Sequence, residues 1–225
     1  MQQKTFWMHK DQQEYPVIRS RHSADAAVVG GGLTGLITAL WLSRAGLRVT
    51  LVEAARLGSG ASGYCAGVAS VCGGTGYARL EKQCGAAAAS AYARTQASAF
   101  RALRDLAREQ GPSSGWRDAD VRLVAESDGD ARLLEKEAQA MMRAGLPASV
   151  GQPSLCPLPA VSALTVRDMG MLHPMRFLRY VAAQAVRHGV KLHEGSRATS
   201  LETNMVHTER GSIQAPYIII ATGYP

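Results

Sequence analysis

The stretch that decides the fold is AAVVGGGLTG, residues 26–35. Its four apolar residues before the glycines are typical of a buried strand in a parallel sheet. Apolar side chains then recur at helical spacing until Gly46, a residue type common just after a helix end. A second apolar run, residues 47–52, has strand character. A strand, a helix and a strand within about 30 residues predict a βαβ unit, and therefore an α/β protein built on a parallel sheet.

The glycines of this stretch have the spacing Gly30-x-Gly32-x-x-Gly35, directly after the predicted strand and at the start of the predicted helix. In that context the first glycine makes a tight turn and the second lets a pyrophosphate approach the backbone. The third lets helix and strand pack closely. The amides of Leu33 and Thr34, at the positive end of the helix dipole, would stabilise the phosphates.

A carboxylate, Glu53, closes the second strand. It can accept hydrogen bonds from both hydroxyls of an adenosine ribose, and it would repel a 2′-phosphate, which disfavours NADP. The order of strand, glycines, helix, strand and acid predicts an adenine-dinucleotide site. The alternative interpretation is that the glycines only form a tight turn and that Glu53 is a surface charge. The motif by itself does not separate FAD from NAD.

The sequence resembles the D-amino-acid-oxidase-like superfamily of flavin-dependent amine and amino-acid oxidoreductases. The resemblance covers nearly all of residues 24–225. The segments that carry it are ADAAVVGGG (24–32), EAARLGSGASG (53–63), GMLHP (170–174) and IATG (220–223). The opening Phe6-Trp7 and the closing residues 221–225 are most similar to one branch, which includes γ-glutamylputrescine-oxidase-like enzymes and relatives with a C-terminal Rieske domain.

The resemblance implies FAD as the cofactor and a set of contacts to it beyond the glycine motif and Glu53. Arg56 would lie near the adenosine or the diphosphate, and Ala66 and Gly67 would lie nearer the flavin ring. The family often has Arg-Asn where this chain has Tyr64-Cys65, so no function is assigned to those two residues. The implied contact residues are Ala54, Arg56, Ala61, Ser62, Gly63, Ala66, Gly67, Ala198, Ala221, Thr222 and Gly223.

The chain is expected to contain two domains of a Rossmann-like flavoprotein. The expected parts are an N-terminal arm (1–23), a first part of the FAD-binding domain (24–112), an incomplete α+β substrate domain (113–167) and a truncated second part of the FAD-binding domain with a β-meander crossover (168–225). Residues 58–76 are glycine-rich and predict a loop, and prolines at 152–159 predict a break. Further helices are expected at 86–110, 128–144 and from 174 to Gly189, and further strands at 121–125, 190–193, 198–202, 205–208, 212–214 and 217–221.

Composition excludes several classes of protein. Apolar residues make up 46% and charged residues 19%, which is a globular composition. The net charge of +7 comes from scattered basic residues, so nucleic-acid binding is not expected. No apolar run has the length of a membrane span, and the polar start lacks a secretion signal. The four cysteines, Cys65, Cys72, Cys84 and Cys156, fit no zinc or redox spacing, and a soluble cytoplasmic protein without a metal is expected.

No catalytic residue is identified from the sequence. Cys65 as a flavin attachment point and His173 facing a substrate are weaker interpretations than a packed thiol and a residue that starts a helix before Pro174. The resemblance implies a small-molecule amine or amino acid as the substrate. Flavin-dependent oxidation needs little acid–base chemistry from the protein, so the absence of an evident base does not argue against an enzyme. The chain lacks the later substrate sheet of the family it resembles. A catalytically inactive fragment that needs a partner chain, and an NAD-binding module, therefore stay as alternatives.

Overall fold

The computed structural model describes residues 5–7, 14–72, 76–152 and 159–223. The chain forms two compact units, Met1–Ala66 with His173–Pro225 (unit 1) and Gly67–Leu172 (unit 2). Most of the predicted proline-rich break at 152–159 lies outside the described residues, as do Cys156 and the closing Tyr224-Pro225.

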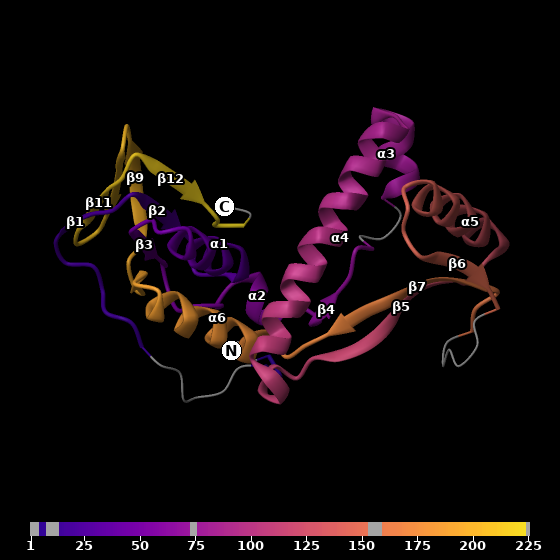
Figure 1. Cartoon of the computed structure of the whole chain (residues 1–225), viewed down its shortest axis with the longest axis horizontal. Coiled ribbons are helices and arrows are strands. Elements are labelled where there is room, and N and C mark those ends of the chain that lie inside the picture. Colours follow the sequence, from indigo (N-terminus) through magenta and orange to yellow (C-terminus); the bar gives the residue numbers. More distant parts are fainter. Residues whose placement is uncertain (1–4, 8–13, 73–75, 153–158, 224–225) are drawn as a thin grey trace. The chain divides into compact units, whose positions relative to one another are not determined.

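Unit 1 is built around a parallel four-stranded sheet (Figure 1). In spatial order its strands are β12 (Tyr217–Ile220), β2 (Ala26–Val29), β3 (Val49–Val52) and β8 (Lys191–His193). Val28 of β2 lies opposite Leu51 of β3 and Ile219 of β12, and both pairings are parallel. The βαβ unit and its parallel neighbours are therefore confirmed.

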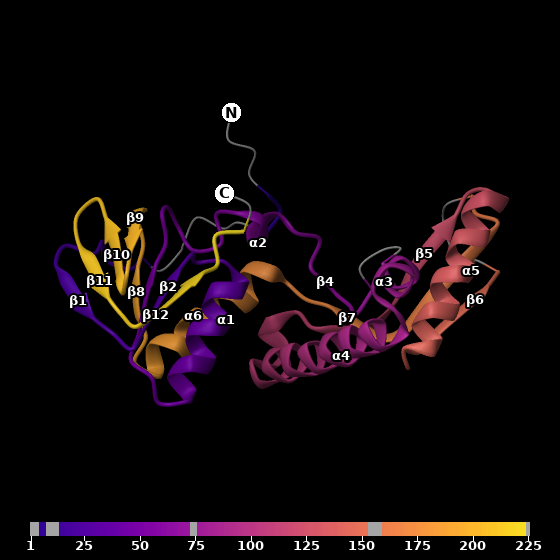
Figure 2. The ribbon, with the colours of Figure 1, turned by 90° about the horizontal axis from the view of Figure 1, so that it is seen from above.

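Helices cover one face of this sheet and a β-meander covers the other (Figure 2). On the first face, α1 (Leu33–Arg44) packs against β2 and β3 and against α6 (Pro174–Arg187). The meander consists of β9 (Ala198–Glu202), β10 (Met205–Thr208) and β11 (Ser212–Gln214), with β1 (Arg21–Ser23) parallel to β11. Val206 and Ile213 of the meander share a core with Ala27, Val29 and Val52 of the parallel sheet. The expected β-meander crossover is present between β8 and β12.

Unit 2 is a small antiparallel sheet with helices packed on it. Its central strand β7 (Ser162–Met171) pairs with β5 (Arg117–Ala125), β6 (Ala148–Gly151) and β4 (Val68–Ala69). The helices are α3 (Tyr77–Cys84), α4 (Ala86–Glu109) and α5 (Asp128–Arg143), with a 3₁₀ turn η1 at Gly111–Ser114. Leu164 and Val166 of β7 join Phe100 of α4 and Met141 of α5 in one core. This is the α+β arrangement that the sequence predicts for its second domain.

The units divide the chain at places other than 112/113 and 167/168, where the sequence analysis divides it. Helix α4, grouped there with the FAD-binding part, lies in unit 2 because Ala93 and Phe100 pack into the core of the antiparallel sheet. The chain crosses between the units at Ala66/Gly67 and Leu172/His173. Neither crossing has a change of composition that would mark it in the sequence.

The strands β6 and β7 and the helix α3 are not predicted by the sequence analysis. The alternation of β7 is interrupted at Asp168, which has a φ of +59°, and the pairing with β5 shifts its register there. A bulge of this kind shifts the alternation of inward and outward side chains, so the strand is not recognised from an alternating apolar pattern. Helix α3 has only eight residues, and so short a helix depends on tertiary contacts rather than on its own sequence.

Two smaller expectations about unit 1 are corrected. The glycine-rich stretch predicted as a loop contains the four-residue helix α2 (Ala61–Tyr64). The apolar spacing of the helix from 174 to Gly189 predicts a buried stripe of Phe177, Leu178, Val181, Ala185 and Val186. The prediction is wrong for Val186, which is 41% exposed. The buried stripe of α6 includes Leu178, Val181 and Ala185, and the next residue is rotated by about 100° away from that stripe.

A buried carboxylate fixes the start of α3. Glu137 on α5 has no exposed surface. Its Oε1 accepts hydrogen bonds from the amides of Gly76 (2.8 Å) and Tyr77 (2.7 Å), and its Oε2 accepts one from Ala78 (2.8 Å). These amides belong to the first turn of a helix, where backbone donors have no partner inside the helix and the dipole favours a negative charge.

We predict that Glu137→Ala destabilises unit 2, because it leaves three amides without their acceptor. Each buried donor left unpaired costs about 1–3 kcal/mol, so a loss on the order of 3 kcal/mol in the free energy of unfolding is expected in urea titrations. Glu135→Ala on the exposed face of the same helix is the matched control. Equal stability of the two variants would contradict this role of Glu137.

Candidate dinucleotide-binding site

The glycine motif lies at the carboxyl edge of the parallel sheet, in the turn between β2 and α1. Gly30 has a φ of +115°, and a Cβ atom there would overlap the carbonyl oxygen of Ala221. A Cβ on Gly35 would overlap the carbonyl oxygen of Gly30. A Cβ on Gly32, in contrast, would meet no backbone atom and only the Ser62 hydroxyl, at 3.1 Å. Two glycines thus allow backbone segments to pack closely, and the third faces a side-chain hydroxyl instead of backbone.

The start of α1 is suited to an anion. Gly32 provides no capping side chain, and the first turn carries no acidic residue. Backbone amides and the positive end of the helix dipole at such a position bind phosphate groups. The amide of Leu33 donates to the Ser62 hydroxyl oxygen (3.0 Å). Because Ser62 accepts this bond, its own O–H can donate to a phosphate oxygen.

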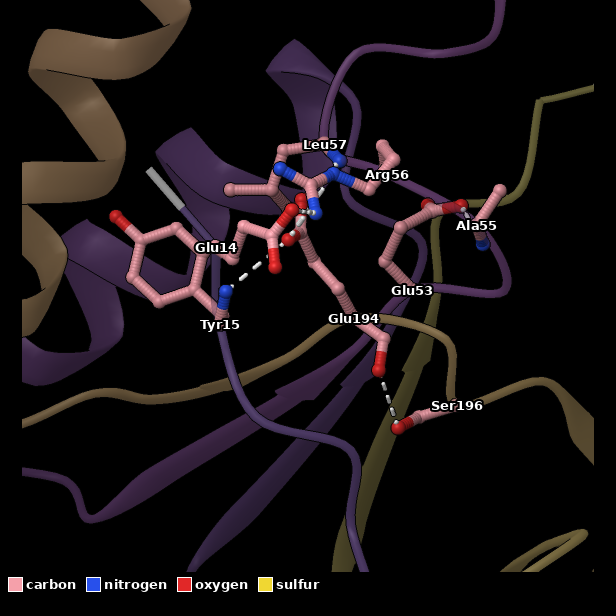
Figure 3. Close-up of polar contacts among 8 residues, drawn as sticks. All are labelled: Glu14, Tyr15, Glu53, Ala55, Arg56, Leu57, Glu194 and Ser196. Atoms are coloured by element: carbon pink, nitrogen blue, oxygen red, sulfur yellow. Dashed lines mark hydrogen bonds and ion pairs between the residues drawn. The ribbon is translucent and has the colours of Figure 1, made fainter. Parts of the chain in front are cut away.

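The carboxylate of Glu53 is held in place by two backbone amides. Its Oε2 accepts from the amide of Gly31 (2.7 Å) and its Oε1 from the amide of Ala55 (2.8 Å), as seen in part in Figure 3. Each carboxylate oxygen has a second lone pair. The side chain at the end of β3 is therefore oriented, and it keeps acceptor capacity for two ribose hydroxyls.

Arg56, in contrast, is paired with carboxylates of the protein. Its Nη1 lies 2.7 Å from Glu14 Oε1, and its Nε lies 3.4 Å from Glu194 Oε2 (Figure 3). Glu194 is only 3% exposed and also accepts hydrogen bonds from the amides of Leu57 (2.7 Å) and Tyr15 (3.1 Å). Two negative partners offset the guanidinium charge, so the geometry favours an anchoring role for Arg56 over a direct bond to the diphosphate.

Glu14 and Glu194 were missed by the sequence analysis. Glu194 follows a short strand, in a polar stretch that reads as a surface turn. Nothing in the sequence indicates its burial, because the covering chain, residues 14–18, is far from it along the sequence. A buried carboxylate must be compensated by hydrogen bonds or charge, and these partners become visible only in the folded unit.

The structure brings most of the predicted site residues of unit 1 to the carboxyl edge of the sheet. Ala61, Ser62 and Gly63 belong to α2, and Ser62 reaches the start of α1. Ala221, Thr222 and Gly223 follow β12, and the Ala221 amide donates to the Val29 carbonyl (2.7 Å).

The remaining predicted contact residues lie in other parts of the chain. Ala54 follows Glu53 directly, and Ala198 begins β9. Ala66 is the last residue of this part of unit 1, whereas Gly67, with a φ of +74°, begins unit 2.

The other candidates from the sequence have structural partners. His173 caps α6, where its Nδ1 accepts from the Arg176 amide (3.3 Å), and its ring packs edge-on against Trp7. The Cys65 thiol lies 3.4 Å from the Ser62 carbonyl oxygen, but Cys65 is exposed, so the expectation of a packed thiol is wrong. Within the described part of the chain, no three His, Cys, Asp or Glu side chains gather as a metal site requires. Of the helices in that same part, none combines the length and the apolarity needed to cross a membrane.

Comparisons with known proteins give a matching family model and similar sequences. The model of the FAD dependent oxidoreductase family (DAO) matches residues 25–224. A γ-glutamylputrescine oxidoreductase of Escherichia coli (strain K12) is 29% identical over 213 residues, covering 88% of this chain and 49% of that protein. A putative Rieske 2Fe-2S iron–sulfur protein of Bacillus subtilis (strain 168) is 22% identical over 99% of this chain and 45% of that protein.

Solved structures show the same fold. Glycine oxidase from Geobacillus kaustophilus superposes with a TM-score of 0.71 at 22% identity, covering 90% of this chain and 56% of that one. An L-amino acid deaminase from Proteus myxofaciens gives a TM-score of 0.68 at 17% identity, covering all of this chain and 50% of that one. The chain therefore spans about half the length of the relatives it matches.

We predict that Glu53→Gln weakens the binding of FAD without unfolding unit 1. The neutral amide loses charge-assisted hydrogen bonds, worth about 1.5–3 kcal/mol each, and it turns an N–H group toward one of the backbone amides that now donate to the carboxylate. A rise in Kd on the order of tenfold to a hundredfold is expected by calorimetry. Glu209→Gln, an exposed carboxylate of the same unit, controls for the change in charge. Equal affinity of the two variants would show that Glu53 does not hold the ribose.

Proposed function

Because the chain belongs to the DAO family of FAD-dependent oxidoreductases, we propose that it is the N-terminal part of an enzyme that oxidises the C–N bond of an amine or amino acid. The observation that carries this proposal is the site at the carboxyl edge of the parallel sheet. There, Gly32 and the Ser62 hydroxyl lie at the start of a helix that has no capping side chain of its own and no acidic residue in its first turn, and Glu53 is oriented by two amides. The residues present fit the adenosine diphosphate portion of FAD.

Each group at this site has a separate task. The first-turn amides of α1 and the Ser62 hydroxyl bind the diphosphate, and the Glu53 carboxylate accepts from the ribose hydroxyls. Ala221, Thr222 and Gly223 bring the end of β12 against the glycine turn, where ligands of parallel sheets bind. When bound, FAD would supply the redox chemistry, because its isoalloxazine ring can accept the hydride from the C–H bond beside the amine nitrogen, so that the C–N single bond becomes C=N.

Small-molecule amines and amino acids are the proposed substrates because the relatives named for γ-glutamylputrescine, glycine and L-amino acids act on that class. Membership of a family of FAD-dependent enzymes also favours FAD over NAD, the choice that the glycine motif leaves open. Specificity within this class is a property of the whole protein, of which the matched chain corresponds to about half.

A second observation supports the requirement for a further polypeptide segment. Strand β12 lies at the edge of the parallel sheet, with β2 as its neighbour in the described residues. Tyr217 and Ile220 on this strand are 64% and 60% exposed. Apolar side chains on an open strand edge are a site for further strand pairing. We therefore propose that a segment equivalent to the other half of the longer relatives covers β12, either in the same polypeptide or as a separate chain.

We predict that the 225-residue chain binds FAD but reduces it slowly in the presence of amines. Displacement of a substrate by about 1 Å can lower the rate on the order of a hundredfold. A substrate site without the residues of the other half of the longer relatives should lower the rate of flavin reduction further. The measurement is the loss of flavin absorbance without oxygen, with the E. coli γ-glutamylputrescine oxidoreductase and its substrate as the positive control. Rapid bleaching by the 225-residue chain would show that no further segment is required.

A further inference from the structure

The N-terminal arm contacts residues 56–65, the loop that carries Ser62, at its two ends. We propose that residues 5–7 and 14–18, the N-terminal strap, hold residues 56–65 in the conformation that binds the dinucleotide. The inference rests on the proposed FAD binding. It assigns to the arm a role that the glycine motif and Glu53 do not include.

The first contact is at the end of α2. The Thr5 hydroxyl donates to the Gly63 carbonyl (2.8 Å), and the Trp7 indole N–H donates to the Cys65 carbonyl (2.9 Å). The last carbonyls of a helix have no partner inside it, and a helix of four residues is not stable alone. The strap thus supplies the C-terminal hydrogen bonds that α2 needs.

The position of α2 matters because it carries Ser62. The Ser62 hydroxyl accepts from the Leu33 amide at the start of α1, and it lies 3.1 Å from the position that a Cβ atom on Gly32 would take. A shift or unwinding of α2 would move this hydroxyl away from the phosphate position. The strap therefore acts on the cofactor site through Ser62, and its side chains are positioning residues rather than ligands.

The second contact is at the start of the loop. Glu14 pairs with Arg56, and the amides of Tyr15 and Leu57 donate to the two oxygens of the buried Glu194 (Figure 3). One carboxylate thus joins the strap to the backbone that follows Glu53. Leu57 immediately precedes Gly58, which has a φ of +73°, so this contact also fixes the entrance to the glycine-rich turn.

Further bonds attach the strap beside β8. The Ile18 amide donates to the Ser196 hydroxyl (3.0 Å), which itself donates to the Glu194 carbonyl (2.9 Å). The His193 Nδ1 lies 3.0 Å from the Pro16 carbonyl. Burial lowers the pKa of His193, so at neutral pH the ring is neutral and forms this bond as the Nδ1–H tautomer. Three nearby side chains, those of residues 193, 194 and 196, therefore hold the strap against unit 1.

The test compares variants that remove one donor and keep the shape. Thr5→Val removes the hydroxyl, Trp7→Phe removes the indole N–H but keeps a ring near His173, and Thr5→Ser keeps the donor. Glu14→Gln weakens the ion pair at the other end, with Glu209→Gln as its matched control. Two measurements are made on the full chain: hydrogen exchange of residues 57–66 without cofactor, and the Kd for FAD by calorimetry.

If the strap orders the loop, Thr5→Val, Trp7→Phe and Glu14→Gln speed exchange in residues 57–66 and leave β2 and β3 unchanged. Thr5→Val and Trp7→Phe raise the Kd for FAD about two- to tenfold, the range for loss of one neutral hydrogen bond. Glu14→Gln raises it by up to about fivefold, the range for loss of an exposed ion pair. Thr5→Ser and Glu209→Gln match the wild type. If all three variants kept the wild-type hydrogen-exchange rates in residues 57–66 and the wild-type Kd for FAD, the proposed role of the strap would be contradicted. Failure of the wild-type chain to bind FAD would overturn the proposed function instead, and loop exchange would still decide whether the strap orders these residues.

Discussion

The close approach of three backbone segments at the glycine turn is the constraint on which unit 1 depends. Gly30, at the end of β2, lies against the carbonyl of Ala221, at the end of β12, while Gly35 on α1 lies against the carbonyl of Gly30. Any side chain at either glycine would separate α1 from the sheet or β12 from β2. Because helix and strands are so close, the first turn of α1 points its amides at the edge where ligands of parallel sheets bind.

Buried or partly buried carboxylates then fix the loops around this frame. Glu53 accepts from one amide after β2 and one after β3, Glu194 joins the arm to the loop after β3, and Glu137 holds the first turn of α3 in unit 2. In each case a side-chain acceptor satisfies amides that have no partner in a helix or sheet. Buried polar groups must be paired, so a few acids determine the course of segments that carry little regular structure.

The two edges of the parallel sheet differ in whether their side chains are bonded to another segment or exposed. Beside β8, the side chains of His193, Glu194 and Ser196 bind the arm. At the other edge, Tyr217 and Ile220 of β12 are exposed. One edge is thus covered by the arm of this chain, whereas the other presents an apolar strand, in agreement with relatives that are about twice as long.

The sequence by itself determined the βαβ unit, the glycine turn, the strands of the meander and the position of Glu53 at the end of its strand. Strand and helix periods and glycine spacing are local properties, so they can be recognised without the fold. The sequence did not determine β7, whose alternation is broken at the bulge near Asp168, nor α2 and α3, which are too short to form without partners. Only the tertiary structure decided that Arg56 pairs with Glu14 and Glu194 and that Glu194 is buried. These contacts join segments distant in the chain, and burial and pairing across such distances depend on how the whole unit packs.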